Sequence, residues 1–264
     1  MTSLAGARAL VTGATGGLGQ AIARALAERG ASITVSGRRA DLLEPLAAEV
    51  GGVALPADLS DRAEVERLVR KAGELDVLVA NAALPASGEL ADLSPEEIDR
   101  SLEVNLRAPI VLARLLTPGM VERGRGHLVF ISSLNGKAAS ARASLYSASK
   151  FGLRGFAFGL RDELRGGGVG VSAVFPGFIR DAGMFADTGV TLPRGVGTRA
   201  PADVGAAVLR AIDEDRAEVD VAPLGLRLGA AVAGFAPELA SSLSRRLGAD
   251  RVSAGMAEAQ RGKR

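Results

Sequence analysis

The stretch that decides the fold of this chain is residues 8–19, RALVTGATGGLG. An apolar run at Arg8–Thr12 leads directly into a glycine-rich turn, and a helical pattern begins at Gly17. In such a strand–turn–helix unit, Gly13 can take the tight turn, Gly17 lets the backbone approach a pyrophosphate, and Gly19 lets the helix pack near the strand. The helix N-terminus offers free N–H groups and a positive dipole end to phosphates. A glycine-rich turn without a ligand is the alternative, but this position in the chain favours a dinucleotide site.

Strand and helix patterns alternate along the rest of the chain. The expected strands are Arg8–Thr12, Ser32–Ser36, Val53–Leu55, Val77–Ala80, His127–Ser132, Val169–Phe175 and Ala217–Ala222. The expected helices are Gly17–Arg29, Ala40–Glu49, Arg62–Ala72, Glu96–Arg123, Leu145–Arg165 and Pro201–Asp213. Apolar strands separated by helices indicate a parallel sheet covered on both faces, and right-handed crossovers make it doubly wound. We therefore expect an α/β fold, a single doubly wound parallel sheet (Rossmann fold) with helices on both faces, as one domain over residues 1–264.

The composition excludes several classes of protein. The 264 residues include no Cys and one His, which excludes a disulfide framework, a thiolate metal site and a two-histidine site. Carboxylate sites remain open on composition, but we expect no metal. A net charge of +2 and 3% aromatic residues argue against nucleic-acid binding. No signal-peptide pattern and no long charge-free apolar run is present, so we expect a cytoplasmic protein. The lone histidine, His127, precedes a strand, and we expect it to be structural or solvated.

The end of the second expected strand selects the form of the dinucleotide. A carboxylate there would bind the adenosine 2′-hydroxyl of NAD, but the chain has Ser36-Gly37-Arg38-Arg39. Two guanidinium groups can bind a 2′-phosphate instead, which favours NADP (NADPH) over NAD. The alternative is that both arginines are solvated residues at the start of a helix.

Tyr146, the only tyrosine, lies four residues before Lys150 on an expected helix. Residues four apart share a helix face, so the phenol and the ammonium can point into one pocket. A nearby ammonium favours the phenolate and would lower a pKa that is ordinarily near 10, which makes Tyr146 a candidate acid/base. An ordinary surface pair is the alternative. Ser133 lies 13 residues upstream at the end of a strand, where a doubly wound fold opens its ligand crevice.

These motifs together resemble the short-chain dehydrogenase/reductase family in its short single-domain form. The resemblance covers roughly Ala7 to Ala222 and rests on the order and spacing of Thr-Gly-x-x-x-Gly-x-Gly, the serine and Tyr-x-x-x-Lys. It implies an NADP(H)-dependent oxidoreductase that interconverts a carbonyl and an alcohol by hydride transfer. It also implies a homodimer or homotetramer paired through the two long helices. We expect a small-molecule carbonyl or alcohol substrate that is fairly apolar.

The resemblance assigns roles to individual positions. Tyr146 matches the catalytic acid/base, and Lys150 matches the lysine that holds the nicotinamide ribose and lowers the tyrosine pKa. Ser133 matches the serine that hydrogen-bonds the substrate oxygen, with Ser132 as the rival. Asn105 matches the asparagine that completes a proton relay through a water. The implied cofactor-binding residues are Gly13, Thr15, Gly16, Gly17, Leu18, Gly19, Arg38, Arg39, Asp58, Leu59, Asn81, Ala82, Tyr146, Lys150, Pro176, Gly177 and Ile179.

Two positions depart from the family pattern. Ala83 stands where the family often has glycine after the fourth strand, which alters a local hydrogen bond. Asp181 stands about where the family commonly has a threonine that contacts the nicotinamide amide. The sequence therefore does not decide which residue contacts the nicotinamide amide, nor how the loop that would cover the substrate is arranged.

Other functions remain as alternatives. The chain could be a catalytically silent NADP(H)-binding regulatory or scaffold protein of the same fold, although its catalytic residues argue against this. A sugar-nucleotide epimerase is a third interpretation, but the chain is short and its glycine spacing differs.

The end of the chain has its own expectations. We expect residues 178–200 to form a substrate lid loop and residues 223–264 a C-terminal extension. In that extension Leu228, Val232, Phe235 and Leu239 fall at helical spacing, which favours packing in the core or at a subunit interface. A cover on an apolar substrate pocket or a peripheral membrane contact are the alternatives. Residues from about Asp250 onward are expected to fray.

Overall fold

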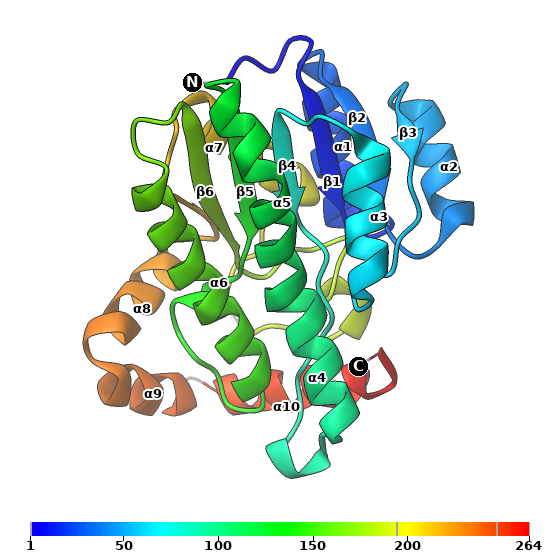
Figure 1. The fold of residues 1–264 in the computed structure, drawn as a ribbon. Coiled ribbons are helices and arrows are strands. Elements are labelled where there is room, and N and C mark those ends of the chain that lie inside the picture. Colours follow the sequence, from blue (N-terminus) through cyan, green and yellow to red (C-terminus); the bar gives the residue numbers. More distant parts are fainter. Residues whose placement is uncertain (1, 194, 247, 264) are drawn as a thin grey trace.

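A parallel β-sheet forms the centre of the computed structural model, which describes residues 2–193, 195–246 and 248–263. Within these residues the sheet has seven strands in the order β3-β2-β1-β4-β5-β6-β7, and each neighbouring pair is parallel (Figure 1). The strands are β1 (Arg8–Thr12), β2 (Ser32–Ser36), β3 (Val53–Ala54), β4 (Val77–Ala80), β5 (Gly126–Ile131), β6 (Val169–Pro176) and β7 (Glu218–Val221). The expected strands are confirmed, with small differences at their ends.

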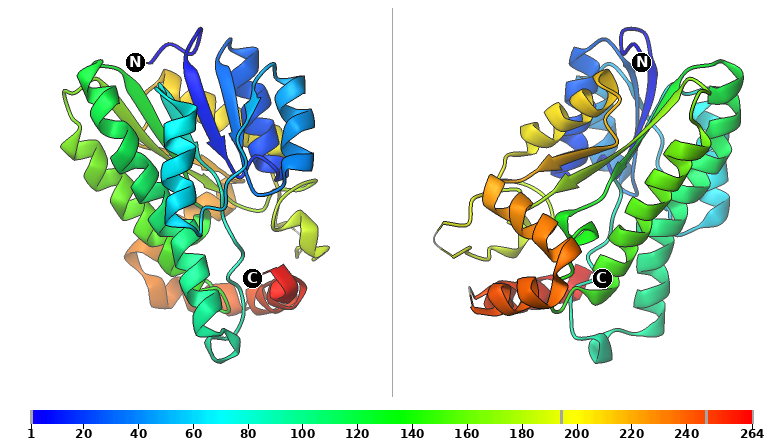
Figure 2. Two further views of the ribbon diagram at one scale, coloured as in Figure 1. Left: turned by 45° about the vertical axis from the view of Figure 1, so that its right-hand side comes forward. Right: turned by 90° about the vertical axis from the view of Figure 1, so that its left-hand side faces the viewer.

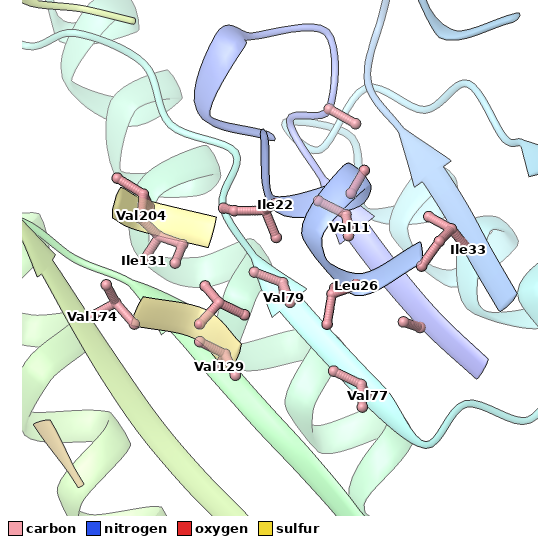
Figure 3. Close-up of a cluster of buried hydrophobic side chains, with 14 of the residues drawn as sticks. Val11, Ile22, Leu26, Ile33, Val77, Val79, Val129, Ile131, Val174 and Val204 are labelled. Atoms are coloured by element: carbon pink, nitrogen blue, oxygen red, sulfur yellow. The ribbon is translucent and has the colours of Figure 1, made fainter. Parts of the chain in front are cut away.

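Helices cover both faces of this sheet. One face carries α1 (Gly17–Glu28), α2 (Ala40–Glu49) and α7 (Pro201–Asp213), and the other carries α3 (Arg62–Ala72), α5 (Ala108–Glu122) and α6 (Ser144–Glu163). Successive strand residues point to opposite faces, so Val79 lies in one core with Ile22 of α1 (Figure 3). Leu78 belongs to the core on the other face, which contains residues of α5. The doubly wound α/β fold expected from the sequence is therefore confirmed.

The expected helix Glu96–Arg123 is not one regular helix. It begins as α4 (Pro95–Leu102), where Ser94 and Glu97 form a capping box, and it continues as α5. Between them lies a π-helical turn, Glu103–Arg107, which carries Asn105. Single π-helical turns of this kind occur frequently at functional sites.

The two halves of the sheet meet between β1 and β4, and hydrogen bonds join them there. The Thr12 hydroxyl accepts from the backbone N–H groups of Asn81 at 3.1 Å and Ala82 at 3.2 Å. The Asn81 amide donates to the Thr12 carbonyl oxygen at 3.0 Å. Chain order reverses at this point, and ligands of doubly wound folds bind in the crevice that opens there.

Three further helices lie beyond the carboxyl edge of the sheet, α8 (Leu224–Phe235), α9 (Pro237–Arg246) and α10 (Ala249–Gln260) (Figure 2). The expectation that the chain frays from about Asp250 is wrong, because α10 is helical and buries Val252, Ala257 and Gln260. Its docking partner is the 178–200 segment, since the Gln260 side-chain amide donates to the Met184 carbonyl oxygen at 3.2 Å.

The apolar stripe in this region is not packed in the core. Leu228, Phe235 and Leu239 are 58%, 94% and 65% exposed, so the expectation of core packing is wrong for this chain. The helical period predicted which residues share a face, but the direction of that face depends on how α8 meets the rest of the fold. None of the helices in the described residues is long and apolar enough to cross a membrane.

Candidate active site

A cleft of about 1700 Å³ opens at the carboxyl edge of the sheet. Its walls come from the β1–α1 turn, from the loops that follow β2, β3, β4, β5 and β6, and from α4, α6, α8, α9 and α10. Every site residue expected from the sequence lines this cleft except Asn105, which lies behind it. Segments that are far apart in the chain therefore converge on one space.

The β1–α1 turn forms a cradle that only glycine can build. Gly13 has a φ of +64°, and a Cβ there would lie 2.6 Å from Ala82 Cα. A Cβ on Gly19 would lie 2.5 Å from the Gly13 carbonyl oxygen. The N-cap residue of α1, Gly16, offers no side-chain hydrogen bond, so the first N–H groups of the helix face the cleft without a cap. This cradle fits the pyrophosphate of a dinucleotide.

The 178–200 segment closes against the same turn. A Cβ on Gly17 would lie 2.3 Å from Ala182 Cβ, and a Cβ on Gly183 would lie 2.7 Å from a Leu18 methyl carbon. Gly17 is therefore required here for the approach of this segment as well as for that of a ligand.

Positive charge gathers at the β2 end of the cleft, where Arg38 and Arg39 are both exposed. Burial alone would raise the pKa of Asp58, but hydrogen bonds from Ser60 and the charges of Arg38 and Arg100 hold it below its usual range. Arg100 is a cleft residue that the sequence interpretation missed, because no motif marks its position on α4. This end of the cleft can bind an anion such as a 2′-phosphate.

Tyr146 and Lys150 lie on α6 and face the cleft together. Lys150 is 1% exposed, and its ammonium donates to the Ile131 carbonyl oxygen at 3.0 Å while lying 5.6 Å from the centre of the Tyr146 ring. Burial lowers the pKa of Lys150 to about 8. Burial likewise raises the pKa of Tyr146 to about 12, against a smaller lowering by a hydrogen bond with Ser133.

The expectation that Lys150 lowers the pKa of Tyr146 is therefore wrong in this structure. The ammonium is directed to the Ile131 carbonyl, and desolvation of the phenol outweighs the other influences on its pKa. Tyr146 is consequently protonated at neutral pH and is available as a proton donor.

The two adjacent serines have different partners. The Ser132 hydroxyl is buried and donates to the Lys150 carbonyl oxygen at 3.1 Å, which ties β5 to α6. The Ser133 hydroxyl accepts from the Asn135 N–H at 3.1 Å, and it acts on the Tyr146 phenol by lowering its pKa against the effect of burial. Ser133 is thus the serine that shares the cleft wall with the phenol.

A group of ion pairs lies next to the turn that follows Ser133. The Lys137 ammonium lies 2.6 Å from an Asp220 carboxylate oxygen and 2.8 Å from one of Glu218, and Arg154 lies 2.7 Å from Glu218. These pairs join the turn after Ser133, β7 and α6. Lys137 is a second lining residue that the sequence interpretation missed, since its partners lie 81 and 83 residues away.

The 178–200 segment and the three C-terminal helices form the remaining wall. Phe178 and Phe185 pack with their ring centres 4.9 Å apart and both line the cleft. Asp181 has a φ of +69°, pairs with Arg180 at 3.3 Å and does not line the cleft. The described residues contain no group of three or more His, Cys, Asp or Glu that could hold a metal ion.

Comparison with known proteins shows which family the chain resembles. The model of short chain dehydrogenases matches residues 7–191. Ketoacyl reductase HetN of Nostoc sp. is 41% identical over 230 residues, which cover 84% of this chain and 80% of the relative.

Solved structures are similar over the same region. A metagenomic short-chain oxidoreductase in complex with NADP has a TM-score of 0.69 and 34% identity, and covers 84% of this chain and 99% of its own. An actinorhodin polyketide ketoreductase with NADPH has a TM-score of 0.74 and 31% identity, and covers 84% of this chain and 98% of its own. The matched family model ends before α8, so the three C-terminal helices lie outside it.

Proposed function

The chain belongs to the short-chain dehydrogenase/reductase family, whose members interconvert carbonyl and alcohol groups with a nicotinamide cofactor, and we propose that it reduces a ketone with NADPH through Tyr146. The observation that carries this proposal is the convergence of Ser133, Tyr146 and Lys150 in the same cleft as the glycine cradle. A silent cofactor-binding protein would not need a protonated phenol beside a serine hydroxyl at this position.

The residues of this chain have separate tasks in the proposed reaction. When bound, the nicotinamide supplies the hydride. Ser133 and Tyr146 donate hydrogen bonds to the carbonyl oxygen, on which negative charge develops. Tyr146, with a pKa of about 12, then gives its proton to that oxygen. Lys150, with a pKa of about 8, exchanges protons near neutral pH, and we assign it the reprotonation of Tyr146.

Asn105 is assigned to the same relay through a water. Its side chain is buried in the π-helical turn and holds the loop that follows β4. We also assign residues 178–200 the role of a lid, because this segment already contacts the phosphate cradle at Gly17.

The cofactor is proposed to be NADP(H) and not NAD(H). The cradle from Gly13 to Gly19 would hold the pyrophosphate, Asp58 and Leu59 would lie beside the adenine, and Arg38 would bind the 2′-phosphate. The absence of a carboxylate directly after β2 supports this choice, as do the NADP complexes of similar proteins.

The substrate is proposed to be a ketone or 3-oxoacyl compound, since HetN is described as a ketoacyl reductase. The test is NADPH oxidation followed by absorbance with a panel of ketones, 3-oxoacyl thioesters and aldehydes. Turnover of at least one carbonyl at a rate well above the substrate-free rate supports the proposal. Tight NADPH binding without turnover of any of them would identify a silent binding protein instead.

We further propose a homodimer or homotetramer paired through α6 and its neighbours. Gly155 and Gly159 are exposed on α6, and a Cβ at either position would meet open space. This face can therefore approach another helix closely, as small residues allow.

A further inference from the structure

The three helices α8, α9 and α10, which we call the C-terminal cover, form one wall of the cleft that contains Tyr146. The cover and the 178–200 segment face this space with apolar side chains, among them Leu226, Ala230, Ala233, Val252, Met256 and Phe185. The charged residues of this wall, Asp187, Arg245 and Asp250, are exposed. Apart from the uncharged polar side chains of Thr188, Ser253 and Gln260, the interior of the wall thus offers little to a charged or highly hydroxylated substrate.

The cover is joined to the lid segment as a continuous wall. The Gln260 amide bonds the Met184 carbonyl at 3.2 Å, and Gly255 lies so close to Val190 that a Cβ would stand 3.0 Å from a valine methyl carbon. A ligand that enters beside Tyr146 therefore meets α10 and the lid together. The volume of about 1700 Å³ exceeds the 300–1,000 Å³ of an ordinary single-ligand pocket, which leaves room for a second, sizeable molecule beside a dinucleotide.

The apolar wall continues out of the cleft along α8. Leu228 and Val232 line the cleft and are nevertheless 58% and 47% exposed, so they stand at its mouth. Exposed apolar side chains that extend from a catalytic cleft gain free energy when an apolar ligand covers them. A hydrocarbon chain that leaves the site over α8 would cover both residues.

We infer that the substrate of this chain carries a long apolar chain next to its carbonyl group, and that the C-terminal cover binds this chain. The inference deepens the proposed carbonyl reductase and rests on it. Each methylene that becomes buried against the cover should raise kcat/KM about fourfold, until the chain passes the mouth of the cleft.

The experiment measures kcat/KM of the full chain with NADPH for methyl ketones from 2-butanone to 2-undecanone. We expect a rise of at least about 30-fold along the series. Ala230→Phe fills part of the space beside the cover. It should lower kcat/KM for 2-undecanone at least about tenfold and change kcat/KM for 2-butanone by no more than about twofold. Ala231→Phe is the matched control, because Ala231 is exposed and does not line the cleft, and it should change neither value.

A second variant guards against a folding defect in Ala230→Phe. Met256→Gln keeps the side-chain volume and makes this part of the wall polar. It should also lower kcat/KM for 2-undecanone about tenfold and leave kcat/KM for 2-butanone unchanged.

The outcomes separate the inference from the proposed function. Turnover that is flat or falls with chain length would overturn the inference and leave the reductase intact. If no ketone is turned over, the proposed reductase fails, and calorimetry with 2-undecanol and the NADP-loaded protein still decides the inference. Binding that is weakened by Met256→Gln but not by Ala231→Phe supports it, and no measurable binding overturns it.

Discussion

The side chain of Asn105 binds the backbone of Leu84 in both directions. Its carbonyl oxygen accepts from the Leu84 N–H at 2.7 Å, and its amide donates to the Leu84 carbonyl oxygen at 2.9 Å. Asn105 is fully buried in the π-helical turn, whereas Leu84 lies in the loop after β4 that lines the cleft. The irregular turn thus fixes the shape of a loop 21 residues away in the sequence.

Asn105→Leu should destabilise the protein and weaken cofactor binding. The change keeps the volume but leaves the N–H and the carbonyl of Leu84 without partners, at about 1–3 kcal/mol for each unsatisfied group. Urea unfolding measures the stability, and calorimetry measures NADPH affinity. Asn105→Asp retains the acceptor and should lie between the wild type and the leucine variant. A leucine variant as stable as the wild type would show that the clamp on Leu84 contributes nothing.

Tyr146→Phe should lower kcat about 100-fold or more and leave NADPH binding unchanged, since the ring remains and only the proton donor is lost. Stopped-flow turnover and cofactor titration measure the two effects separately. Ser133→Ala should also slow turnover, and Ser132→Ala provides the comparison because its hydroxyl bonds the Lys150 carbonyl. Near-normal turnover of the phenylalanine variant would refute the role of Tyr146.

The direction of the reaction should depend on pH in a way that follows from the phenol. With a pKa of about 12, Tyr146 is protonated throughout the neutral range, which suits reduction. Alcohol oxidation needs the phenolate, so its rate should keep rising with pH above 8 while the rate of reduction does not. Initial rates in both directions between pH 6 and 10 test this, and parallel profiles would contradict it.

Arg38→Ala should weaken NADPH binding about 10- to 100-fold and leave NADH binding nearly unchanged. A guanidinium bonded to a phosphate contributes roughly 1.5–3 kcal/mol, and NADH has no phosphate at that position. Arg39→Ala should have the smaller effect, and added salt should reduce the preference of the wild type. Equal loss of both cofactors in Arg38→Ala would mean that the arginine is only a solvated helix-start residue.

His127 should make the protein sensitive to acid. The side chain is 1% exposed and lies 2.8 Å from the Ser172 hydroxyl, as expected for a structural residue, and burial lowers its pKa to about 4. The unfolded chain takes up this proton near pH 6.5, whereas the folded protein takes it up only near pH 4. The contribution of neutral His127 to the free energy of unfolding is therefore fully present above pH 6.5 and is lost as the pH falls toward 4. Between pH 7 and 5 the loss should be about 2 kcal/mol.

Urea unfolding of His127→Gln at the same two pH values provides the control. The glutamine can still bond Ser172 but does not titrate, so its stability should fall by about 2 kcal/mol less over this range. An identical loss in both proteins would assign the acid sensitivity to other groups.

Light scattering should detect a dimer or tetramer at micromolar concentration. Gly155→Glu places a charge on the exposed face of α6 and should lower the measured mass. Val53→Glu changes an exposed apolar residue on β3, the edge strand at the other end of the sheet from β6, and should not lower the mass. A monomeric wild type would refute the assembly.

The sequence by itself determined the order of strands and helices, the glycine turn and the motif residues that line the cleft. These follow from local rules: period-2 and period-3.6 patterns, and a turn at Gly13 that requires positive φ. Parallel strands bring their carboxyl ends to one edge, so residues that follow the strands must meet there.

Only the tertiary structure decided the properties that depend on distant partners. The pKa of Tyr146 rises because the fold desolvates it, and α10 packs on the 178–200 segment, where Gln260 bonds Met184, 76 residues away. The exposure of Leu228 was also decided by the tertiary structure, because an apolar stripe on a helix does not specify whether it faces a core, a cleft or solvent. Burial is a property of the whole fold, and no local pattern contains it.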